Sequence, residues 1–338
     1  MNRYVEKSDF VVIVAPGCLH ADRRDPETNL RTKTCYRTYR NRGWCVLEMA
    51  CSLHSREKTH PALLITSAEG TPEWVSPLEA LKLAVGLCNF TCCQRNHKFG
   101  DKIVPCDRGI TREILETLIA SKVEHLFKTD NIKLARLFHC MTQWWTRGPS
   151  SSSQVASCTS LADLKHQLRW DESLDGQDIT VPWVDRAGIS ILAYGVAVNE
   201  IKVVQEILQL HNDRKSSLLA WRFPKEGVVE VGIPGHSTCL YGAMCFASPE
   251  IVTVLLEAGA DVGITDVMGN DPFMAACGMG RLDNVEMWCS RFKDWKIDTR
   301  NQKFGSTALN IALYMGPRKL DLVKYLVRES HVRISICI

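Results

Sequence analysis

The feature that most constrains the fold is a pair of residues, apolar except for Asn284, that recurs along the second half of the chain. The pairs begin at positions 203, 251, 284 and 322, so they are separated by 48, 33 and 38 residues. Each lies in a stretch with helical spacing: Val203-Val204, Ile251-Val252, Asn284-Val285 and Leu322-Val323. A period near 33 with insertions is typical of a helical solenoid, whose helix pairs bury their apolar faces against one another. The sequence predicts an all-α array of about four units over residues 183–338.

A glycine-led turn and a helix rich in small residues precede these pairs. The third unit contains Gly269, Pro272, Ala276 and Gly280, and the second ends in Gly259-Ala260-Asp261. These units resemble ankyrin repeats. The resemblance implies an ankyrin solenoid whose concave face and turn tips bind another protein.

Two departures from the repeat pattern are visible. Asn199 stands where the first unit would have its turn glycine, and about 14 extra residues separate the first two units. The insertion is placed at His211 to roughly Pro224 and is expected to form a loop on the binding face. Six residues are predicted to contact a partner: Trp221, Phe223, Tyr241, Asn270, Asp271 and Asn310.

The first 146 residues alternate short apolar runs with amphipathic stretches. Strands are predicted at 10–14 and 62–65, and helices at 44–53, 77–87 and 111–122, an order that favours an α/β domain with a parallel sheet. The serine-rich stretch that follows is typical of a linker, with a short helix at 161–170. The predicted divisions are residues 1–146, 147–182 and 183–338.

One part of this first domain carries a further motif. Ser8-Asp9 leads into an apolar strand, and Trp44-Cys45 is followed by Glu48. This arrangement resembles the middle of a TIR domain over about 50 residues. The resemblance implies a flavodoxin-like parallel sheet, incomplete because the family's first strand and loop would precede it. In family members that hydrolyse NAD, the matching glutamate is the catalytic carboxylate, which here is Glu48.

Basic and aromatic residues alternate before this helix. Five cations are interleaved with Tyr36 and Tyr39: Arg31, Lys33, Arg37, Arg40 and Arg42. Such a pattern can hold phosphates and stack bases, but it is more often that of a solvated loop. Under the first interpretation Arg40, Arg42 and Trp44 bind NAD, which is a substrate, and no cofactor is expected.

Cysteine and histidine form two loose groups. One contains Cys88, Cys92, Cys93, His97 and Cys106, and the other contains Cys51, His54 and His60. Neither has the paired two-residue spacing of structural zinc sites, so the sequence predicts no metal. Phosphate-binding and dinucleotide-binding glycine motifs are also absent from the sequence.

Composition restricts the partners and the compartment. Lys plus Arg total 41 against 38 Asp plus Glu, too even a balance to favour nucleic acid or an anionic membrane. The 15 cysteines and the lack of a signal-peptide pattern favour reduced thiols in the cytoplasm, with the nucleus as a second possibility. The apolar end Ile334–Ile338 leads us to expect either further repeats beyond it or a tail that packs back.

Two functions are consistent with these features. The first is an ankyrin-repeat adaptor, with a TIR-like domain serving interaction or signalling and a protein as partner. The second is a TIR-like NAD hydrolase centred on Glu48, with the repeats as a targeting module.

Overall fold

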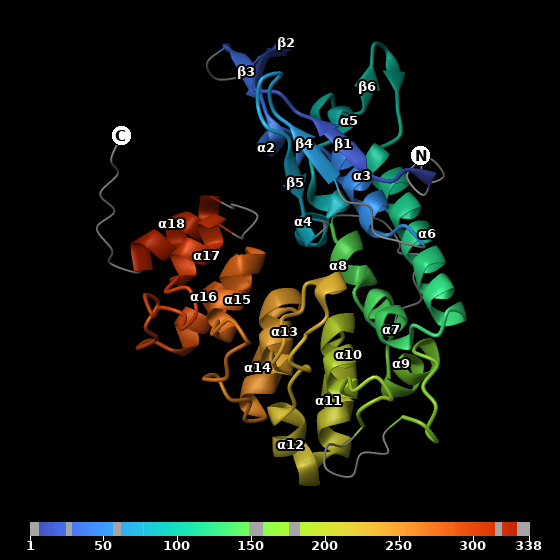
Figure 1. The fold of residues 1–338 in the computed structure, drawn as a ribbon, viewed down its shortest axis with the longest axis vertical. Coiled ribbons are helices and arrows are strands. Elements are labelled where there is room, and N and C mark those ends of the chain that lie inside the picture. Colours follow the sequence, from blue (N-terminus) through green and yellow to red (C-terminus); the bar gives the residue numbers. More distant parts are fainter. Residues whose placement is uncertain are drawn as a thin grey trace. The chain divides into compact units, whose positions relative to one another are not determined.

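The computed structural model (Figure 1) describes residues 7–24, 29–56, 62–76, 78–148, 158–175, 183–314 and 320–329. The chain divides into two compact units, residues 1–156 and residues 157–338, which we call the N-terminal and C-terminal units. Among the described residues, no helix is both long enough and apolar enough to cross a membrane. The predicted behaviour of Ile334–Ile338 concerns residues outside those described.

A three-stranded sheet lies in the N-terminal unit, with the order β1 (Val11–Val14), β4 (Ala62–Ile65) and β5 (Glu73–Val75). Strands β1 and β4 are parallel and in register from Val11 opposite Ala62 to Val14 opposite Ile65, which confirms the two predicted strands. The two predicted strands pair in parallel as expected, but β5, which was not predicted, is antiparallel to β4, so the sheet is mixed. The short connection from β4 to β5 explains this, because a parallel crossover needs about a dozen residues or more.

The connection from β1 to β4 contains most of the small elements of this unit. A hairpin of β2 (Cys18–Arg24) and β3 (Arg31–Thr34) is followed by α2 (Tyr36–Tyr39) and α3 (Gly43–Leu53). Helix α3 confirms the helix predicted at 44–53, and nine of its residues are buried. Its buried apolar residues place α3 in the core of the N-terminal unit.

The predicted helix at 77–87 is interrupted. Residues Leu78–Lys82 form α4 and Val85–Leu87 form a single 3₁₀ turn, with Ala84 extended between them. The indole Nε1 of Trp144 donates a hydrogen bond to the carbonyl oxygen of Leu81 at 2.8 Å. That carbonyl would otherwise accept the next intrahelical bond, so a tertiary contact accompanies the break.

Helices form the remainder of this unit. Helix α6 (Asp107–Lys128) contains the predicted helix at 111–122 and extends it at both ends, and α7 (Ile132–Cys140) and α8 (Thr142–Thr146) follow. Between α3 and α6 lie α5 (Thr91–Gln94) and a hairpin of β6 (Lys98–Phe99) and β7 (Lys102–Ile103). Trp145 of α8 is 1% exposed and packs against His54 and Phe138 in the core.

The C-terminal unit begins with α9 (Leu161–Gln167), shorter than the helix predicted at 161–170. Four helix pairs follow: α10 (Ile191–Val198) with α11 (Ile201–Leu210), α13 (Cys239–Phe246) with α14 (Pro249–Glu257), α15 (Pro272–Met279) with α16 (Leu282–Arg291), and α17 (Ala308–Tyr314) with α18 (Leu320–Glu329). Figure 1 shows them as successive paired coils from yellow to red.

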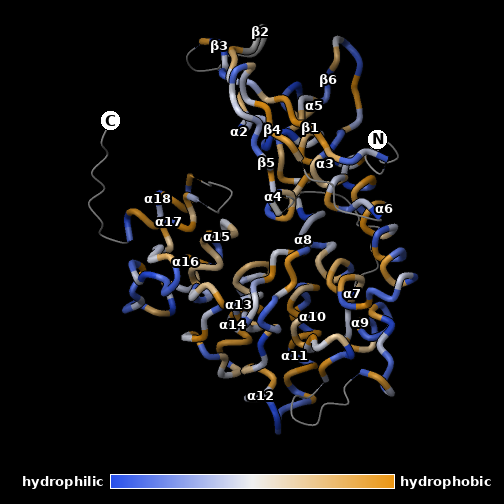
Figure 2. The backbone as a smooth tube through the Cα atoms, in the orientation of Figure 1, coloured by the Kyte–Doolittle hydropathy of each residue, from blue (hydrophilic) through white to orange (hydrophobic). Residues whose placement is uncertain are grey.

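The recurring pairs of the sequence lie in the second helix of each helix pair. Val203, Val204, Ile251, Val252, Asn284 and Val285 are each 0% exposed, and Leu322 is 1% exposed. In Figure 2 hydrophobic colouring follows α10 and α13 in this unit, and β1 and β4 in the other. The prediction that helix pairs bury each other's apolar faces is therefore confirmed.

Candidate functional site

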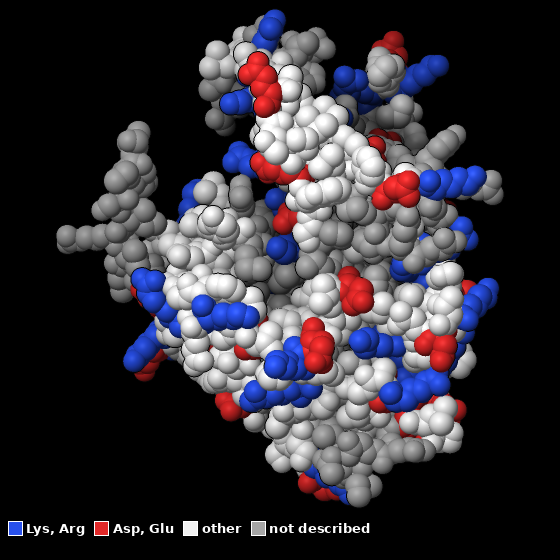
Figure 3. All heavy atoms as spheres, viewed as in Figure 1, with Lys and Arg blue, Asp and Glu red and all other residues white. Residues whose placement is uncertain are grey.

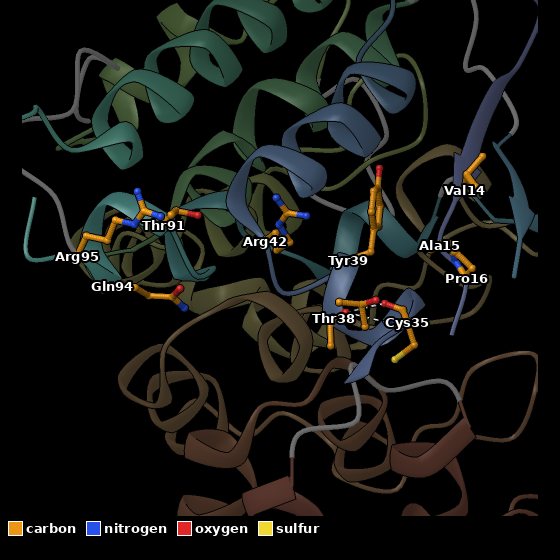
Figure 4. Close-up of a pocket in the computed structure, with 11 residues that line it drawn as sticks. Val14, Ala15, Pro16, Cys35, Thr38, Tyr39, Arg42, Thr91, Gln94 and Arg95 are labelled. Carbon is orange, nitrogen blue, oxygen red and sulfur yellow. Dashed lines mark hydrogen bonds between the residues drawn. The ribbon is translucent and has the colours of Figure 1, made fainter. Parts of the chain in front are cut away.

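A pocket of about 580 Å³ lies in the N-terminal unit beyond the carboxyl end of β1. Val14, Ala15 and Pro16 form one wall; the other lining residues are Thr34, Cys35, Thr38, Tyr39, Arg42, Thr91, Gln94 and Arg95. Figure 4 shows the α2 side chains on one side and the α5 side chains on the other, with Arg42 between them. The carboxyl edge of parallel strands is where open α/β sheets commonly bind ligands.

The charge of this pocket favours an anion. Arg42 and Arg95 are its charged residues, and no acidic side chain is among its described lining residues. Arg42 precedes α3 as its N-cap residue, in extended conformation, which places it at the positive end of that helix. Guanidinium groups suit phosphate oxygens because they donate several hydrogen bonds in one plane.

Glu48 is not among the lining residues, but it is linked to one of them. The hydroxyl of Tyr39 donates a hydrogen bond to Oε2 of Glu48 at 3.2 Å. Burial, followed by the charge of Glu48, raises the pKa of Tyr39 above its ordinary value, so the phenol remains a donor at neutral pH. Glu48 is thus one hydrogen bond away from a residue that lines the pocket.

Arg40 and Trp44, also predicted to bind a nucleotide, are engaged elsewhere. An oxygen of Glu79 lies 2.8 Å from Nη2 of Arg40, whose guanidinium also lies over the Tyr36 ring. The indole of Trp44 donates to Oδ2 of Asp107 at 3.0 Å and so fastens α3 to the start of α6. Of the predicted nucleotide-binding residues, only Arg42 lines the pocket.

Cys35, at the rim of this pocket, was not singled out from the sequence. A hydrogen bond from the Thr38 backbone, assisted by the charge of Arg37, lowers the pKa of the Cys35 thiol against the effect of its burial. Thr38 and Cys35 also exchange two hydrogen bonds, of 2.9 and 2.8 Å, across the first turn of α2. The signal that could have found Cys35 is its position immediately before a short helix whose third residue is threonine.

The cysteine and histidine groups of the sequence separate in space. Cys92, Cys93, His97 and Cys106 offer ligand atoms that all lie within 4.8 Å of one another. Burial, with hydrogen bonds to Cys106 and Cys92, raises the pKa of the Cys93 thiol to about 11. Cys88 is not part of this cluster, because its thiol donates to the Ala84 carbonyl oxygen at 3.3 Å.

The described members of the second group, Cys51 and His54, lie in the hydrophobic core. His54 is buried against Phe138 and Trp145, with ring centroids at 5.5 and 4.6 Å. Cys51 is 0% exposed, and burial raises the pKa of its thiol to about 11. His60 lies outside the described residues.

In the C-terminal unit, an acidic or amide side chain recurs in the turns between helix pairs. Oδ1 of Asp185 accepts from the backbone of Ala187 and Ile189, both at 2.9 Å. Asp266 repeats this with two backbone donors at 2.8 and 2.9 Å, and Asn301 with two at 2.9 and 3.1 Å. Each turn then needs a positive φ, supplied by Gly188, Gly269 and Gly305.

These turns are also connected to the helices and to one another. The hydroxyl of Tyr194 donates to Asp185 at 2.6 Å, and that of Tyr241 donates to Asp266 at 2.8 Å. Nδ2 of Asn301 donates to Oδ1 of Asn270 at 2.7 Å. This bond joins the turn of Asp266, which is the third along the chain, to the turn of Asn301, which is the fourth. The turns that contain Asp266 and Asn301 are therefore held to each other rather than as independent loops.

The second turn is different because it contains most of the insertion. The backbone N–H of Phe223 donates to Ser237 at 2.9 Å, as that of Asp185 does to Ile189, so Phe223 occupies the Asp185 position. Thr238, the N-cap of α13, follows 15 positions later, whereas 5 positions separate Asp185 from the N-cap Ser190. Most of the extra chain is thus residues 224–236, after the predicted placement at 211–224, which contains the additional short helix α12 (Lys215–Ala220). We call residues 224–236 the tip insertion.

Three predicted partner-binding residues belong to the core. Trp221, Phe223 and Tyr241 are 8%, 5% and 7% exposed. The rings of Trp221 and Phe223 pack edge to face, with their centroids 4.7 Å apart. Side chains this deeply buried have little surface to offer a partner, so their sequence signal reflects packing.

The three polar candidates lie at or beside the turn tips. Asn270 is half-buried and bonds to Asp266, while Asp271 caps α15 by accepting from Met274 at 2.7 Å. Asn310 is exposed in the first turn of α17 and bonds to Thr307 at 3.0 Å. Figure 3 shows acidic and basic residues mixed on the face in view, without a continuous field of one sign.

Residues 238–336 match the family model of ankyrin repeats, in 3 copies. Ankyrin repeats are thus found in this part of the chain. The match contains the helix pairs from α13 to α18, and the α10–α11 pair that precedes it has the same turn anchor at Asp185. A comparison with curated proteins gives no match. Stacked repeats of this kind present an extended concave surface, and proteins are their general partners.

Proposed function

We propose that the chain is a protein-binding adaptor whose partner docks on the row of turn tips in the C-terminal unit. The observation that carries this is the tip insertion, because an insertion in one repeat maps to a loop that is often on the binding face. The proposed setting is intracellular signalling, in the cytoplasm or nucleus. This setting is supported by the resemblance of the N-terminal residues to TIR domains and by the abundant free cysteines.

The tip insertion has the order that a binding surface needs. Val228 and Ile233 exchange backbone hydrogen bonds of 2.8 and 3.0 Å, and Gly227 donates to Pro224 at 2.8 Å. The carbonyl of Gly235 accepts from Val267 of the third turn at 2.9 Å. A surface held in this way loses little conformational freedom on binding, which favours affinity.

The insertion also offers an apolar contact beside charges. Val229 is 69% exposed, and Lys225, Glu226 and Glu230, all within four positions of it in sequence, are exposed as well. An apolar side chain surrounded by charged ones is typical of the centre and rim of a protein interface. The proposed contact surface therefore centres on Val229.

Photocrosslinking tests this assignment. A photoreactive phenylalanine at Val229 should give an adduct with the partner, and the same residue at Leu210 should give none. Leu210 is a matched control because it is 56% exposed and lies at the end of α11, outside the turns themselves. Adducts from position 210 alone, or from neither position, would contradict the proposed surface.

A second candidate function, NAD hydrolysis, is supported by the pocket beyond β1. Its two arginines suit a pyrophosphate because no acidic residue is among the described lining residues, and Glu48 accepts a hydrogen bond from Tyr39. A carboxylate in such a place would stabilise the cationic ribose that forms as nicotinamide departs. In this mechanism Tyr39 must turn aside when substrate enters.

Nicotinamide release from NAD tests this second function. Glu48→Gln should abolish release, because it removes the charge while keeping the shape, and Tyr39→Phe should alter it. Glu113→Gln is the control, since Glu113 is an exposed carboxylate on α6. Absence of release from the unaltered chain would remove the hydrolase proposal and leave the adaptor untouched.

A further inference from the structure

We propose that Cys92, Cys93, His97 and Cys106 bind a structural zinc ion that fastens the β6–β7 hairpin to the start of α6. Three thiolates and one imidazole form one of the usual ligand sets of structural zinc. This proposal departs from the prediction of no metal, which was based on ligand spacing in the sequence alone. Adjacent cysteines and a histidine four positions after the second of them give no paired two-residue spacing.

The distances agree with a tetrahedral ion. Sγ of Cys93 lies 3.5 Å from that of Cys106 and 4.0 Å from that of Cys92. Ligands at a Zn–S distance of about 2.3 Å are separated by roughly 3.8 Å along a tetrahedron's edge. All four ligand atoms lie within 4.8 Å of one another. A shift of each ligand atom by about 0.5 Å would therefore bring them to the separations of a tetrahedral zinc site.

An unpartnered nitrogen provides independent support. Nε2 of His97 is buried and has no hydrogen-bond partner among the described residues. A buried polar atom without a partner is unfavourable, and it is a common sign of an ion or water at that place. The cysteine sulfurs around it are weak hydrogen-bond partners but strong zinc ligands.

Two backbone segments position the four ligands, and the first is the turn from Cys92 to His97. The N–H of His97 donates to the Cys92 carbonyl at 2.7 Å, and that of Asn96 to Cys93 at 3.1 Å, which forms a tight turn. Asn96 and His97 both have positive φ, 49° and 57°. Successive non-glycine residues in this conformation persist only where their surroundings determine it, as a bound ion would.

The second segment is the start of α6. Cys106 is the N-cap residue of α6, and the backbone N–H of Asp107 points at Sγ of Cys92 at 3.4 Å. Hydrogen bonds of this kind to thiolates are the outer contacts that orient zinc ligands. The helix N-terminus adds a favourable field for the negative charge of the site.

The hairpin itself explains why an ion would be needed. Both strands are two residues long, and their residues are all exposed, including Phe99 at 66% and Ile103 at 83%. A two-stranded hairpin without a buried face is marginal in water. Zinc would replace the missing core, and it would also fix α5, whose other residues line the pocket beyond β1.

Zinc binding would release up to three thiol protons to solvent, because the ligands are thiolates and neutral imidazole. The complex would carry one negative charge. Four basic residues flank the ligands in sequence and would offset it: Arg95, Lys98, Lys102 and Arg108.

The test is metal analysis of the full chain purified without chelator. We expect about one zinc ion per chain, and we expect substitution by Co²⁺ to give the thiolate-to-cobalt charge-transfer absorption of a tetrahedral site. His97→Ala should speed zinc loss to a chelator by at least about tenfold. His97→Cys should restore retention, because it returns a fourth ligand. Cys88→Ser, which alters a nearby thiol outside the cluster, should leave zinc content unchanged.

Two results would overturn the proposal. One is a folded chain without zinc that gives no cobalt–thiolate absorption. The other is a disulfide between Cys93 and Cys106, found by mass spectrometry of peptides from protein alkylated before digestion. Circular dichroism of each variant separates loss of the ion from loss of the fold.

Discussion

The two units of this chain stabilise their buried polar atoms in different ways. In the C-terminal unit one arrangement recurs, with Asp185, Asp266 and Asn301 each accepting backbone hydrogen bonds in a turn. In the N-terminal unit the buried polar groups are treated differently from one another: Nζ of Lys122 donates to the carbonyl oxygens of Ser55 and Arg56, whereas Nδ1 of His54 has no partner among the described residues. Repetition makes the C-terminal unit a sum of similar local structures, whereas the N-terminal unit depends on one shared core.

Buried cysteines make this comparison measurable in the full chain. Cys51 and Cys140 are buried in the N-terminal unit, and Cys239 and Cys277 in the C-terminal unit. Labelling of thiols at increasing urea, read peptide by peptide, reports where each unit opens. The predictions below use this measurement.

The largest effect is expected from a matched pair of tryptophan substitutions. Trp145 and Trp288 are 1% and 0% exposed, so each substitution to alanine should cost about 3–5 kcal/mol. Trp145→Ala should expose Cys51 and Cys140 together, because they share one core. Trp288→Ala should expose Cys277 at lower urea than Cys239, because its effect should fade along the array.

Other orders of cysteine exposure would contradict the proposed difference between the two units. If Trp288→Ala exposed Cys239 and Cys277 at the same urea concentration, the repeats would unfold as one block. If Trp145→Ala exposed Cys140 alone, the N-terminal unit would not have a single core. Labelling of the unaltered unit in each variant is the internal control.

Acid should weaken the N-terminal unit through His54. Complete burial, together with the charge of Lys122, lowers the pKa of His54 to about 3. Its folded pKa is below its unfolded value, so the unfolded state takes up the proton first, and stability present above about pH 6.5 is lost as pH falls. Between that pH and about pH 5, the loss for one such group is about 2 kcal/mol.

A thiol reagent that reacts in acid would measure this loss at Cys51 and Cys140. His54→Phe keeps an aromatic ring against Phe138 and Trp145 and should flatten the pH dependence. His211 is the corresponding histidine of the C-terminal unit, because burial lowers its pKa as well. An equal acid loss in the wild type and His54→Phe would show that another group is responsible.

A smaller effect is expected from the buried amide that joins two repeats. Nδ2 of Asn284 lies within 3.1–3.4 Å of the carbonyl oxygens of Ala243, Met244 and Ala247 at the end of α13. Asn284→Ala should cost about 1–3 kcal/mol, because these acceptors lose a buried donor. Exposure of Cys239 and Cys277 at lower urea would show it. Asn310→Ala, at an exposed site, should stay within about 0.5 kcal/mol.

The repeats were predictable from sequence because each helix pair repeats the same apolar spacing. Asn199 illustrates this: it replaces the turn glycine, and it has the positive φ of 62° that the position requires. The tip insertion was misplaced because its turn has Phe223 where the other described turns have Asp or Asn. Without that anchor, the sequence does not show where the insertion begins.

The N-terminal unit was less predictable because its arrangement depends on distant contacts. The helix at 77–87 breaks where Trp144, more than 60 positions later, takes the Leu81 carbonyl. The cluster of Cys92, Cys93, His97 and Cys106 depends on a turn with two positive φ values that no glycine announces. The spacing of residues in the sequence predicts neither the helix break nor the turn that brings the four ligands together.

The smallest effect should come from Asp271, and it has the opposite sign. Burial raises the pKa of this carboxyl group, although it accepts the backbone N–H of Met274 at 2.7 Å as the N-cap of α15. Its folded pKa is above the unfolded value, so the charged form costs stability once pH rises through the folded pKa. Asparagine caps helices about as well and carries no charge.

Asp271→Asn should therefore stabilise the C-terminal unit at about pH 7, by less than about 1 kcal/mol, and the gain should shrink as pH falls toward the ordinary range of a carboxyl group. Cys277, which lies in the same helix, reports it through later labelling in urea. A loss of stability at neutral pH would mean that the charge itself holds the helix, by interaction with its N-terminus. The ankyrin turn would then depend on electrostatics as well as on hydrogen bonds, and the contrast between the two units would narrow.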